Sequence, residues 1–245
     1  MTPSSDFPLT EREQELADQY TQIATLVGSL AHEIKNPLST IRLNIDLLAE
    51  DLEHPQTPRE RRAAAKMEAV QRECQRLQQL LDDFLRFAKV QSLELQPGDL
   101  NSLVARLLDF FEPEAAKSRI EVIRYLDPNL PHVMMDAETL YAAMLNLVIN
   151  AQQAMPDGGQ LVVRTRGTKS GVAVDFIDTG GGMDQKTIGR AFNAFFTTKP
   201  DGSGLGLPTT RKILEAHGGT LSVQSEVGRG TQFTIELPVP ARLTR

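Results

Sequence analysis

The chain has 245 residues and a hydrophobic content of 40%, which suits one large or two modest globular domains. Its net charge of −6, without a long basic run, argues against nucleic acid as a partner. The single cysteine, Cys74, excludes an internal disulfide framework and fits a reducing compartment.

Neither a signal peptide nor a membrane segment is expected in this chain. Residues 1–9 are polar and lack the basic start and apolar centre of a signal peptide, so we predict a disordered N-terminus. The longest uncharged run, 139–156, contains asparagines and glutamines, which a membrane span would bury at a high cost in free energy. We therefore interpret this run as a core helix.

Residues 10–94 are predicted to form an antiparallel helical hairpin. A proline-bearing break at 54–56 separates two helices, and apolar residues recur along both at steps of three and four. Each helix begins at a capping box, in which a Thr and a Glu three residues later satisfy backbone amides of the first turn: Thr10 with Glu13, and Thr57 with Glu60. A lone hairpin only half covers two apolar stripes, so we expect a homodimer with a four-helix bundle.

One histidine of the first helix is a candidate nucleophile. His32 lies two residues from both Leu30 and Ile34 of the apolar stripe, so its ring is expected on the opposite, solvent-facing side. Glu33 is beside it, and Asn36 follows one turn later on the same face. Imidazole ionises near pH ~6.5, so such a histidine beside a carboxylate can act as a nucleophile at neutral pH. Taken alone, an ordinary exposed histidine is the simpler interpretation.

Residues 95–240 are predicted to form a second domain with a helical layer on one face of a mixed sheet. The turn at 96–98 marks the boundary, Asp99 and Asp136 are placed to cap helices, and 241–245 form a tail. The sequence lacks the regular strand-helix alternation of a doubly wound fold, which favours an α+β sandwich. The predicted elements are helices over 100–117 and 137–155, a helix ending near 217, and strands over 120–126, 132–135, 160–168, 172–178, 220–225 and 231–237.

The helix over 137–155 carries two amides on one face, Asn146 and Asn150, among apolar neighbours. Buried amides must form hydrogen bonds, and a pair bonded to neighbouring backbone is the structural interpretation. The functional alternative is a face that coordinates Mg²⁺ and the phosphate oxygens it carries, because hard cations prefer oxygen ligands.

Asp178 ends an apolar strand and is followed at once by Gly180, Gly181 and Gly182. Glycines allow the backbone to approach a planar ligand closely, and a carboxylate at the strand end can accept a hydrogen bond from an exocyclic amine. A tight turn is the structural alternative.

A second glycine-rich segment follows three phenylalanines and Lys199. Gly202, Gly204 and Gly206 alternate with single residues just before a predicted helix. This pattern is typical of a flexible lid and of a phosphate cradle at the positive end of a helix.

In this order, the five motifs resemble the catalytic core of bacterial two-component sensor histidine kinases, in the branch that includes nitrogen-regulatory kinases. The resemblance covers residues 21–237. The motifs are His32-Glu33-x-x-Asn36-Pro37, the helical stretch 146–154, Asp178-x-Gly180-x-Gly182, the segment 192–199, and Gly202-x-Gly204-x-Gly206.

The resemblance implies a dimerisation hairpin followed by an ATP-binding α/β sandwich of the type shared with gyrase, heat-shock and mismatch-repair ATPases. By position, His32 is the phosphoacceptor, whose ring nitrogen attacks the γ-phosphorus of ATP. Glu33 is implied as the general base that bonds the other ring nitrogen. Asn36 matches the position that orients a water when such proteins dephosphorylate their partner.

ATP and Mg²⁺ are the implied cofactors. Asn150 would hold Mg²⁺ with support from Asn146, and Asp178 would read the adenine amino group. The other residues implied at the nucleotide and its lid are Gly180, Gly182, Lys199, Gly202, Gly204, Leu205 and Gly206.

Two positions define the expected chemistry further. ATPases of this fold place a water-activating Glu where this helix has Asn146, which cannot act as a base at pH 7, so phosphate is expected to go to His32. Many family members carry a basic residue where this chain has Gln153. Lys199 or Arg190 could supply that charge from elsewhere.

The resemblance implies a protein-histidine kinase that passes the phosphoryl group from His32 to an aspartate of a response-regulator receiver domain, and that also dephosphorylates this partner. A catalytically silent ATP-binding scaffold is one alternative, and an ATPase or serine kinase of the same fold is another. The chain is expected to be cytoplasmic, on its own or as the cytosolic part of a longer membrane-bound sensor.

Overall fold

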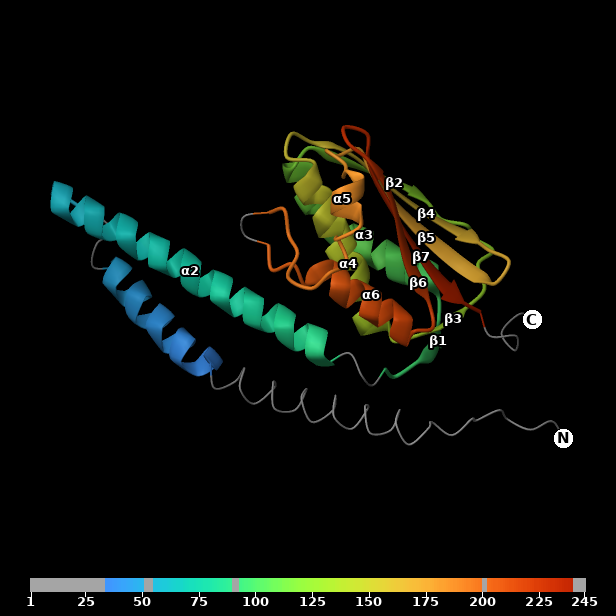
Figure 1. Ribbon diagram of the computed structural model, residues 1–245, viewed down its shortest axis with the longest axis horizontal. Helices are drawn as coiled ribbons and strands as arrows, with labels where there is room; N and C mark the ends of the chain where they lie inside the picture. The colour runs from blue at the N-terminus through green and yellow to red at the C-terminus, as the bar shows by residue number, and fades with distance from the viewer. Residues whose placement is uncertain (1–33, 51–54, 90–92, 200–201, 240–245) are drawn as a thin grey trace. The chain divides into compact units, whose positions relative to one another are not determined.

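The computed structural model describes residues 34–50, 55–89, 93–199 and 202–239 (Figure 1). The chain divides into two compact units, one up to residue 91 and the other from residue 92. Within the described residues, no helix is long and apolar enough to cross a membrane.

The first unit is the predicted antiparallel hairpin. Its helices are 34–50 and α2 (Pro58–Lys89). The second capping box is confirmed, because the Glu60 amide donates to Thr57 Oγ1 at 3.2 Å and the Thr57 amide donates to the Glu60 carboxylate at 3.0 Å. The first capping box, Thr10 with Glu13, lies outside the described residues.

Polar side chains join the two helices of the hairpin. Lys35 pairs with Asp82 at 3.0 Å, and further along Gln71 donates to Asp46 at 2.8 Å. The partners run in opposite directions along the two helices, which confirms the antiparallel arrangement. Leu38 and Cys74 are buried. Other apolar residues of the two helices are exposed: Ile34, Ile41, Leu43, Leu47, Leu48, Val70 and Leu77.

The second unit is a five-stranded mixed sheet with its three longest helices on one face (Figure 1). The strand order is β2-β4-β5-β7-β6, with β2 parallel to β4 and the other neighbours antiparallel. The elements are β1 (Gln96–Gly98), α3 (Leu100–Lys117), β2 (Ile120–Tyr125), β3 (Val133–Met135), α4 (Ala137–Ala154), β4 (Gly159–Gly167), β5 (Gly171–Asp178), α5 (Gln185–Ile188), α6 (Gly206–Ala216), β6 (Thr220–Glu226) and β7 (Gly230–Pro238).

The predicted caps position the two longest helices of this unit. Asp99 accepts a hydrogen bond from the Asn101 amide at 2.8 Å, and Asp136 accepts one from the Thr139 amide at 3.1 Å. Apolar residues of α3, α4 and the inner face of the sheet then form one core. The helices and strands that were predicted begin and end within one residue of their observed bounds.

Two elements were not predicted. The turn expected at 96–98 is strand β1, which pairs antiparallel with β3. Proline is tolerated there because a two-stranded ribbon leaves one side of each strand without a ladder partner. The short helix α5 is preceded by Asp184, which caps it by accepting a hydrogen bond from the Thr187 amide at 2.7 Å.

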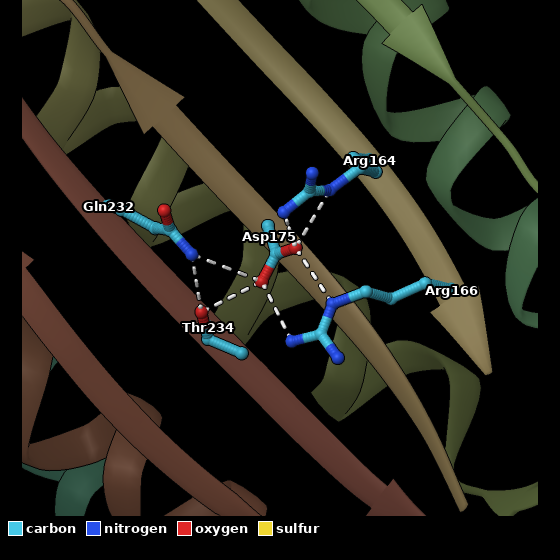
Figure 2. Close-up of polar contacts among 5 residues, drawn as sticks. All are labelled: Arg164, Arg166, Asp175, Gln232 and Thr234. Atoms are coloured by element: carbon cyan, nitrogen blue, oxygen red, sulfur yellow. Dashed lines mark hydrogen bonds and ion pairs between the residues drawn. The ribbon is translucent and has the colours of Figure 1, made fainter. Parts of the chain in front are cut away.

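The outer face of the sheet carries one fully buried carboxylate, Asp175 of β5 (Figure 2). Arg164 and Arg166 of β4 bond its Oδ2 at 2.8–3.1 Å, and Thr234 of β7 donates to its Oδ1 at 2.8 Å. Burial opposes ionisation, but the hydrogen bonds from Arg166, Arg164 and Thr234 outweigh it, so the pKa of Asp175 is lowered. The carboxylate therefore stays charged and holds three strands together.

We predict that Asp175→Asn destabilises the second unit by about 1–3 kcal/mol, because two arginines lose a common anion and an amide N–H₂ would face one of them. The arginines are half exposed, which moderates the loss. Urea unfolding followed by near-UV circular dichroism measures it, since Tyr125 and Tyr141 both lie in this unit.

The matched control is Asp109→Asn, which removes the exposed partner of Arg124 and should change the free energy of unfolding by less than about 0.5 kcal/mol. Equal losses in the two variants would contradict the structural importance of Asp175.

Candidate functional site

The residues predicted to form the site lie in both units. His32 and Glu33 lie outside the described residues. Asn36 lies in the first turn of the described part of its helix and is exposed, and its backbone carbonyl accepts a hydrogen bond from Thr40 Oγ1 at 3.1 Å. The Asn36 amide is therefore presented to solvent, next to Lys35 and its ion pair across the hairpin.

Asn146 of α4 joins this helix to α6. Its Nδ2 donates to Thr210 Oγ1 at 2.9 Å, and Thr210 Oγ1 in turn donates to the Gly206 carbonyl at 3.0 Å. A Cβ atom at Gly206 would lie 2.4 Å from Asn146 Oδ1, so any larger residue at the start of α6 would displace the Asn146 amide. Asn146 thus fixes the point at which the glycine-rich segment enters its helix.

Asn150, one turn further along α4, faces a lysine from the glycine-rich segment. Lys199 Nζ donates to Asn150 Oδ1 at 2.7 Å and also contacts Gln153 Oε1. Burial lowers the pKa of Lys199. The structure therefore brings together two predicted site residues, Asn150 and Lys199, and Gln153, the position of α4 at which a basic residue had been expected from the resemblance.

Asp178 is buried at the end of β5, on the sheet face that carries the helices. The amides of Gly180 and Thr231 donate to its Oδ1 at 2.8 and 3.2 Å. No hydrogen bond joins Oδ2 to another described residue. Every buried side-chain oxygen and nitrogen among these residues has a hydrogen-bond partner, so Oδ2 is not a fully buried atom. Burial raises the pKa of Asp178, against the lowering effect of these two amides. Oδ2 is an acceptor that a ligand can use.

The glycines after Asp178 pack against the C-terminal end of α4. A Cβ atom at Gly180 would lie 2.6 Å from the Ala154 carbonyl oxygen and 2.8 Å from Asp178 Oδ1. The next residue, Gly181, donates its amide to the same Ala154 carbonyl at 3.1 Å. Gly182 has a φ of +65° and lies against the Glu226 backbone. The Asp178 loop is thereby fixed beside α4.

The glycine-rich segment contains a tight backbone crossing. Gly204 has a φ of +68°, and a Cβ atom there would lie 2.5 Å from the Phe195 carbonyl carbon. Phe195 itself has a φ of +64°, which is unusual for a bulky residue, and its amide donates to the Gly204 carbonyl at 3.0 Å. Gly202 lies against Thr197, and Leu205 is buried immediately before α6. The described residues of this segment meet α4 at two points, where Lys199 contacts Asn150 and where Gly206 lies against Asn146.

The donor set fits a magnesium ion that is shared with a phosphate ligand. The described residues contain no cluster of three or more His, Cys, Asp or Glu side chains for a metal. Asn150 instead offers one amide oxygen, which already accepts from a cation. Mg²⁺ commonly binds one or two protein oxygens and completes its shell with phosphates and water.

Two polar contacts of this site were not predicted from the sequence. Thr210, which bonds Asn146, lies four residues after Gly206 on an ordinary amphipathic helix. Thr231 contributes its backbone amide to Asp178 from a strand 53 residues later. The sequence around Thr210 does not mark it as a partner of Asn146. The Thr231 contact uses a backbone amide, which any residue except proline can provide.

We predict that Asp178→Asn stabilises the second unit at pH 7. The pKa of Asp178 is raised in the fold, so the fold loses stability as the pH rises above the unfolded value near ~3.9 and the buried group ionises. An asparagine oxygen can accept the same two amides without the charge. The gain should shrink towards zero below about pH 4, where the carboxyl group is protonated in both states.

Urea unfolding at pH 7 and pH 4 measures the difference in the free energy of unfolding between wild type and Asp178→Asn. Asp184→Asn is a control for which the opposite sign is expected. The hydrogen bonds of Thr187 lower the pKa of Asp184, so its replacement should give a small loss at pH 7. A loss of stability in Asp178→Asn at pH 7 would contradict the conclusion that the charge of the buried Asp178 carboxylate destabilises the fold.

Comparison with known proteins assigns both units. Residues 22–93 match the family described as the His Kinase A (phospho-acceptor) domain. Residues 135–241 match the family described as Histidine kinase-, DNA gyrase B-, and HSP90-like ATPase.

Similarity to individual proteins extends over nearly the whole chain. Sensor histidine kinase ZraS of Escherichia coli (strain K12) is 32% identical over 231 residues, which are 94% of this chain and 49% of ZraS. The chain thus spans about half the length of this relative.

Two solved structures agree with this similarity. ShkA in complex with AMPPNP matches 87% of this chain and 45% of its own, with 28% identity and a TM-score of 0.70. The mycobacterial sensor histidine kinase MprB matches 59% of this chain and 97% of its own, with 30% identity and a TM-score of 0.53. The chain thus has a phospho-acceptor domain followed by a kinase-type ATPase domain, and it is similar to sensor kinases along most of its length. These findings place this protein in the family of two-component sensor histidine kinases.

Proposed function

We propose that the chain is an ATP-dependent protein-histidine kinase that phosphorylates itself on His32 and passes the phosphoryl group to an aspartate of a response-regulator receiver domain. Membership of the sensor histidine kinase family supports the proposal. The observation that carries it is α4, where Asn146 and Asn150 contact α6 and the glycine-rich segment while the Asp178 loop is bonded to the end of the same helix.

The nucleotide is proposed to bind along this face. Asp178 Oδ2 would accept a hydrogen bond from the adenine amine, while Oδ1 stays bonded to two backbone amides. Asn150 Oδ1 would hold Mg²⁺, which when bound neutralises phosphate charge. The solved ShkA structure contains AMPPNP, which supports an ATP-type ligand for this fold.

His32 is proposed as the nucleophile. A bond forms between its ring nitrogen and the γ-phosphorus, the bond from that phosphorus to the β-phosphate oxygen breaks, and ADP leaves with the electron pair. Glu33 takes the proton from the other ring nitrogen. In the next step a receiver aspartate oxygen forms the new bond to phosphorus and the nitrogen-phosphorus bond breaks.

Asn146 favours transfer to histidine over hydrolysis. Its Nδ2 is committed to Thr210, and an amide cannot take a proton from water at neutral pH. The position therefore supports the lid and activates no water. This argues against an ATPase of the same fold. A catalytically silent ATP-binding scaffold remains the alternative that experiment must exclude.

The functional unit is proposed to be a homodimer. Apolar residues of both hairpin helices are exposed, among them Ile41, Leu48 and Leu77 at 45–51% of their surface. Packing two hairpins into a four-helix bundle would bury them. We propose residues 10–94 as this dimerisation and phosphotransfer module, 95–240 as the ATP-binding domain, and a cytoplasmic location for both.

We predict that His32→Gln abolishes self-labelling by γ-labelled ATP, because no nucleophilic ring nitrogen remains. Wild-type label should be acid-labile and base-stable, as expected for a phosphoamidate. Treatment of the trapped protein with acid and base measures this. The control His132→Gln, which replaces an exposed histidine of the second unit, should label like wild type. Acid-stable label would indicate a serine kinase, and unlabelled wild type that binds ATP would indicate the scaffold.

Asn36→Ala is predicted to keep self-phosphorylation within about twofold of wild type and to lower dephosphorylation of the phosphorylated receiver about tenfold or more. The exposed Asn36 amide is free to orient a water, and the substitution leaves the helix intact. Release of phosphate from a prephosphorylated receiver measures the second activity. The control is Asn44→Ala, two turns further along the helix, which should change neither activity. Equal losses of both activities would contradict the role of Asn36.

A further inference from the structure

Thr210 is a buried polar side chain of α6 that faces α4. It is only 1% exposed, and its hydroxyl group takes part in two hydrogen bonds. Thr210 Oγ1 donates to the Gly206 carbonyl, one turn earlier, at 3.0 Å and accepts from Asn146 Nδ2 at 2.9 Å. A hydroxyl group has a single proton. Since that proton is shared with the Gly206 carbonyl, Thr210 presents a lone pair to Asn146.

This lone pair decides which way the Asn146 amide is turned. The end of the amide that meets a lone pair must be the N–H₂ end, because the oxygen end has no proton to share. Turning the amide over would either bring two acceptors together or cost Thr210 its hydrogen bond to Gly206. The hydroxyl group therefore holds the Asn146 amide with Oδ1 directed away from Thr210.

The oxygen of this amide lies at the start of α6. A Cβ atom at Gly206 would be 2.4 Å from Asn146 Oδ1 and 3.1 Å from Nδ2, and glycine leaves that space open. No hydrogen bond joins Oδ1 to another described residue. Every buried side-chain oxygen among these residues has a partner, so Oδ1 is not a fully buried atom. Asn146 thus keeps one acceptor that a ligand can use.

The orientation of the amide matters because Asn146 and Asn150 lie four residues apart and share one face of α4. Mg²⁺ takes oxygen ligands, whereas an N–H₂ group would turn its positive end to the cation. With Asn146 held as observed, α4 offers a metal and its phosphates two amide oxygens. With the amide turned over, it would offer one oxygen and one repelling group.

We propose that Thr210 is a positioning residue, which fixes the Asn146 amide with Oδ1 towards the metal and phosphates bound at Asn150. This inference rests on the proposed nucleotide binding. Asn146 is half-buried, so water can satisfy either end of its amide. Without the Thr210 hydroxyl group the amide would populate both orientations and other rotamers. The apparent affinity for the metal would then fall by the fraction that remains competent.

The Mg²⁺ dependence of AMPPNP binding to the full chain tests the proposal. Calorimetric titration gives the Mg²⁺ concentration that half-saturates binding. Valine has the shape of threonine without the hydroxyl group, so Thr210→Val should raise this concentration about 3–10-fold. Thr210→Ala should raise it as much without any risk of overpacking. Thr210→Ser keeps the hydroxyl group and should stay within about twofold of wild type.

Thr209→Val is the matched control. Thr209 Oγ1 also donates to a carbonyl one turn earlier, that of Leu205 at 2.6 Å, but no hydrogen bond joins it to a described residue of α4. The substitution removes the same kind of helix contact from the same turn, so the half-saturating Mg²⁺ concentration should stay within about twofold of wild type. A rise equal to that of Thr210→Val would overturn the inference.

Asn146→Asp isolates the orientation of the side chain. A carboxylate has an oxygen at both ends, so turning it over changes nothing. In this background Thr210→Val should change the half-saturating Mg²⁺ concentration by less than about twofold, whatever the new charge does by itself. The same 3–10-fold rise in both backgrounds would show that Thr210 supports α6 and does not orient the amide.

Adenosine, which has no phosphate and needs no metal, separates positioning from damage to the domain. Its affinity, measured by competition with a fluorescent nucleotide, should be the same in wild type and Thr210→Val. Parallel losses of adenosine and AMPPNP, or wild-type Mg²⁺ dependence in Thr210→Val or Thr210→Ala, would overturn the inference and leave nucleotide binding intact. A wild-type chain that binds neither ligand would instead overturn the proposed function itself.

Discussion

The site depends on how firmly α6 is held along α4, because the lid runs directly into α6. At one end, buried His217 accepts the Asp136 amide on Nε2 at 3.0 Å, and its Nδ1 lies 2.7 Å from the Ile213 carbonyl. These partners require the tautomer with the proton on Nδ1. At the other end, Asn146 bonds Thr210. With both ends fixed, α6 holds the start of its helix, Gly206, against Asn146 of α4.

Strand β5 carries two buried aspartates whose pKa values move in opposite directions. Asp175 points to the outer face of the sheet, where two arginines compensate its charge and its pKa is lowered. Asp178, three residues later, points to the opposite face, where backbone amides are its only described donors and burial raises its pKa. One charge stabilises the fold. The other is kept at a cost to stability, which is the pattern expected where a ligand completes the electrostatics.

Local signals in the sequence were enough to predict most elements and the outline of the site. Asp99, Asp136 and the Thr57-Glu60 box cap helices as expected, because a cap depends only on residues within one turn. Strand β1 was taken for a turn because its pairing with β3 is a contact over more than thirty residues that no local pattern reveals. The same holds for Lys199: its chemistry was visible, but its neighbours Asn150 and Gln153 precede it by more than forty residues.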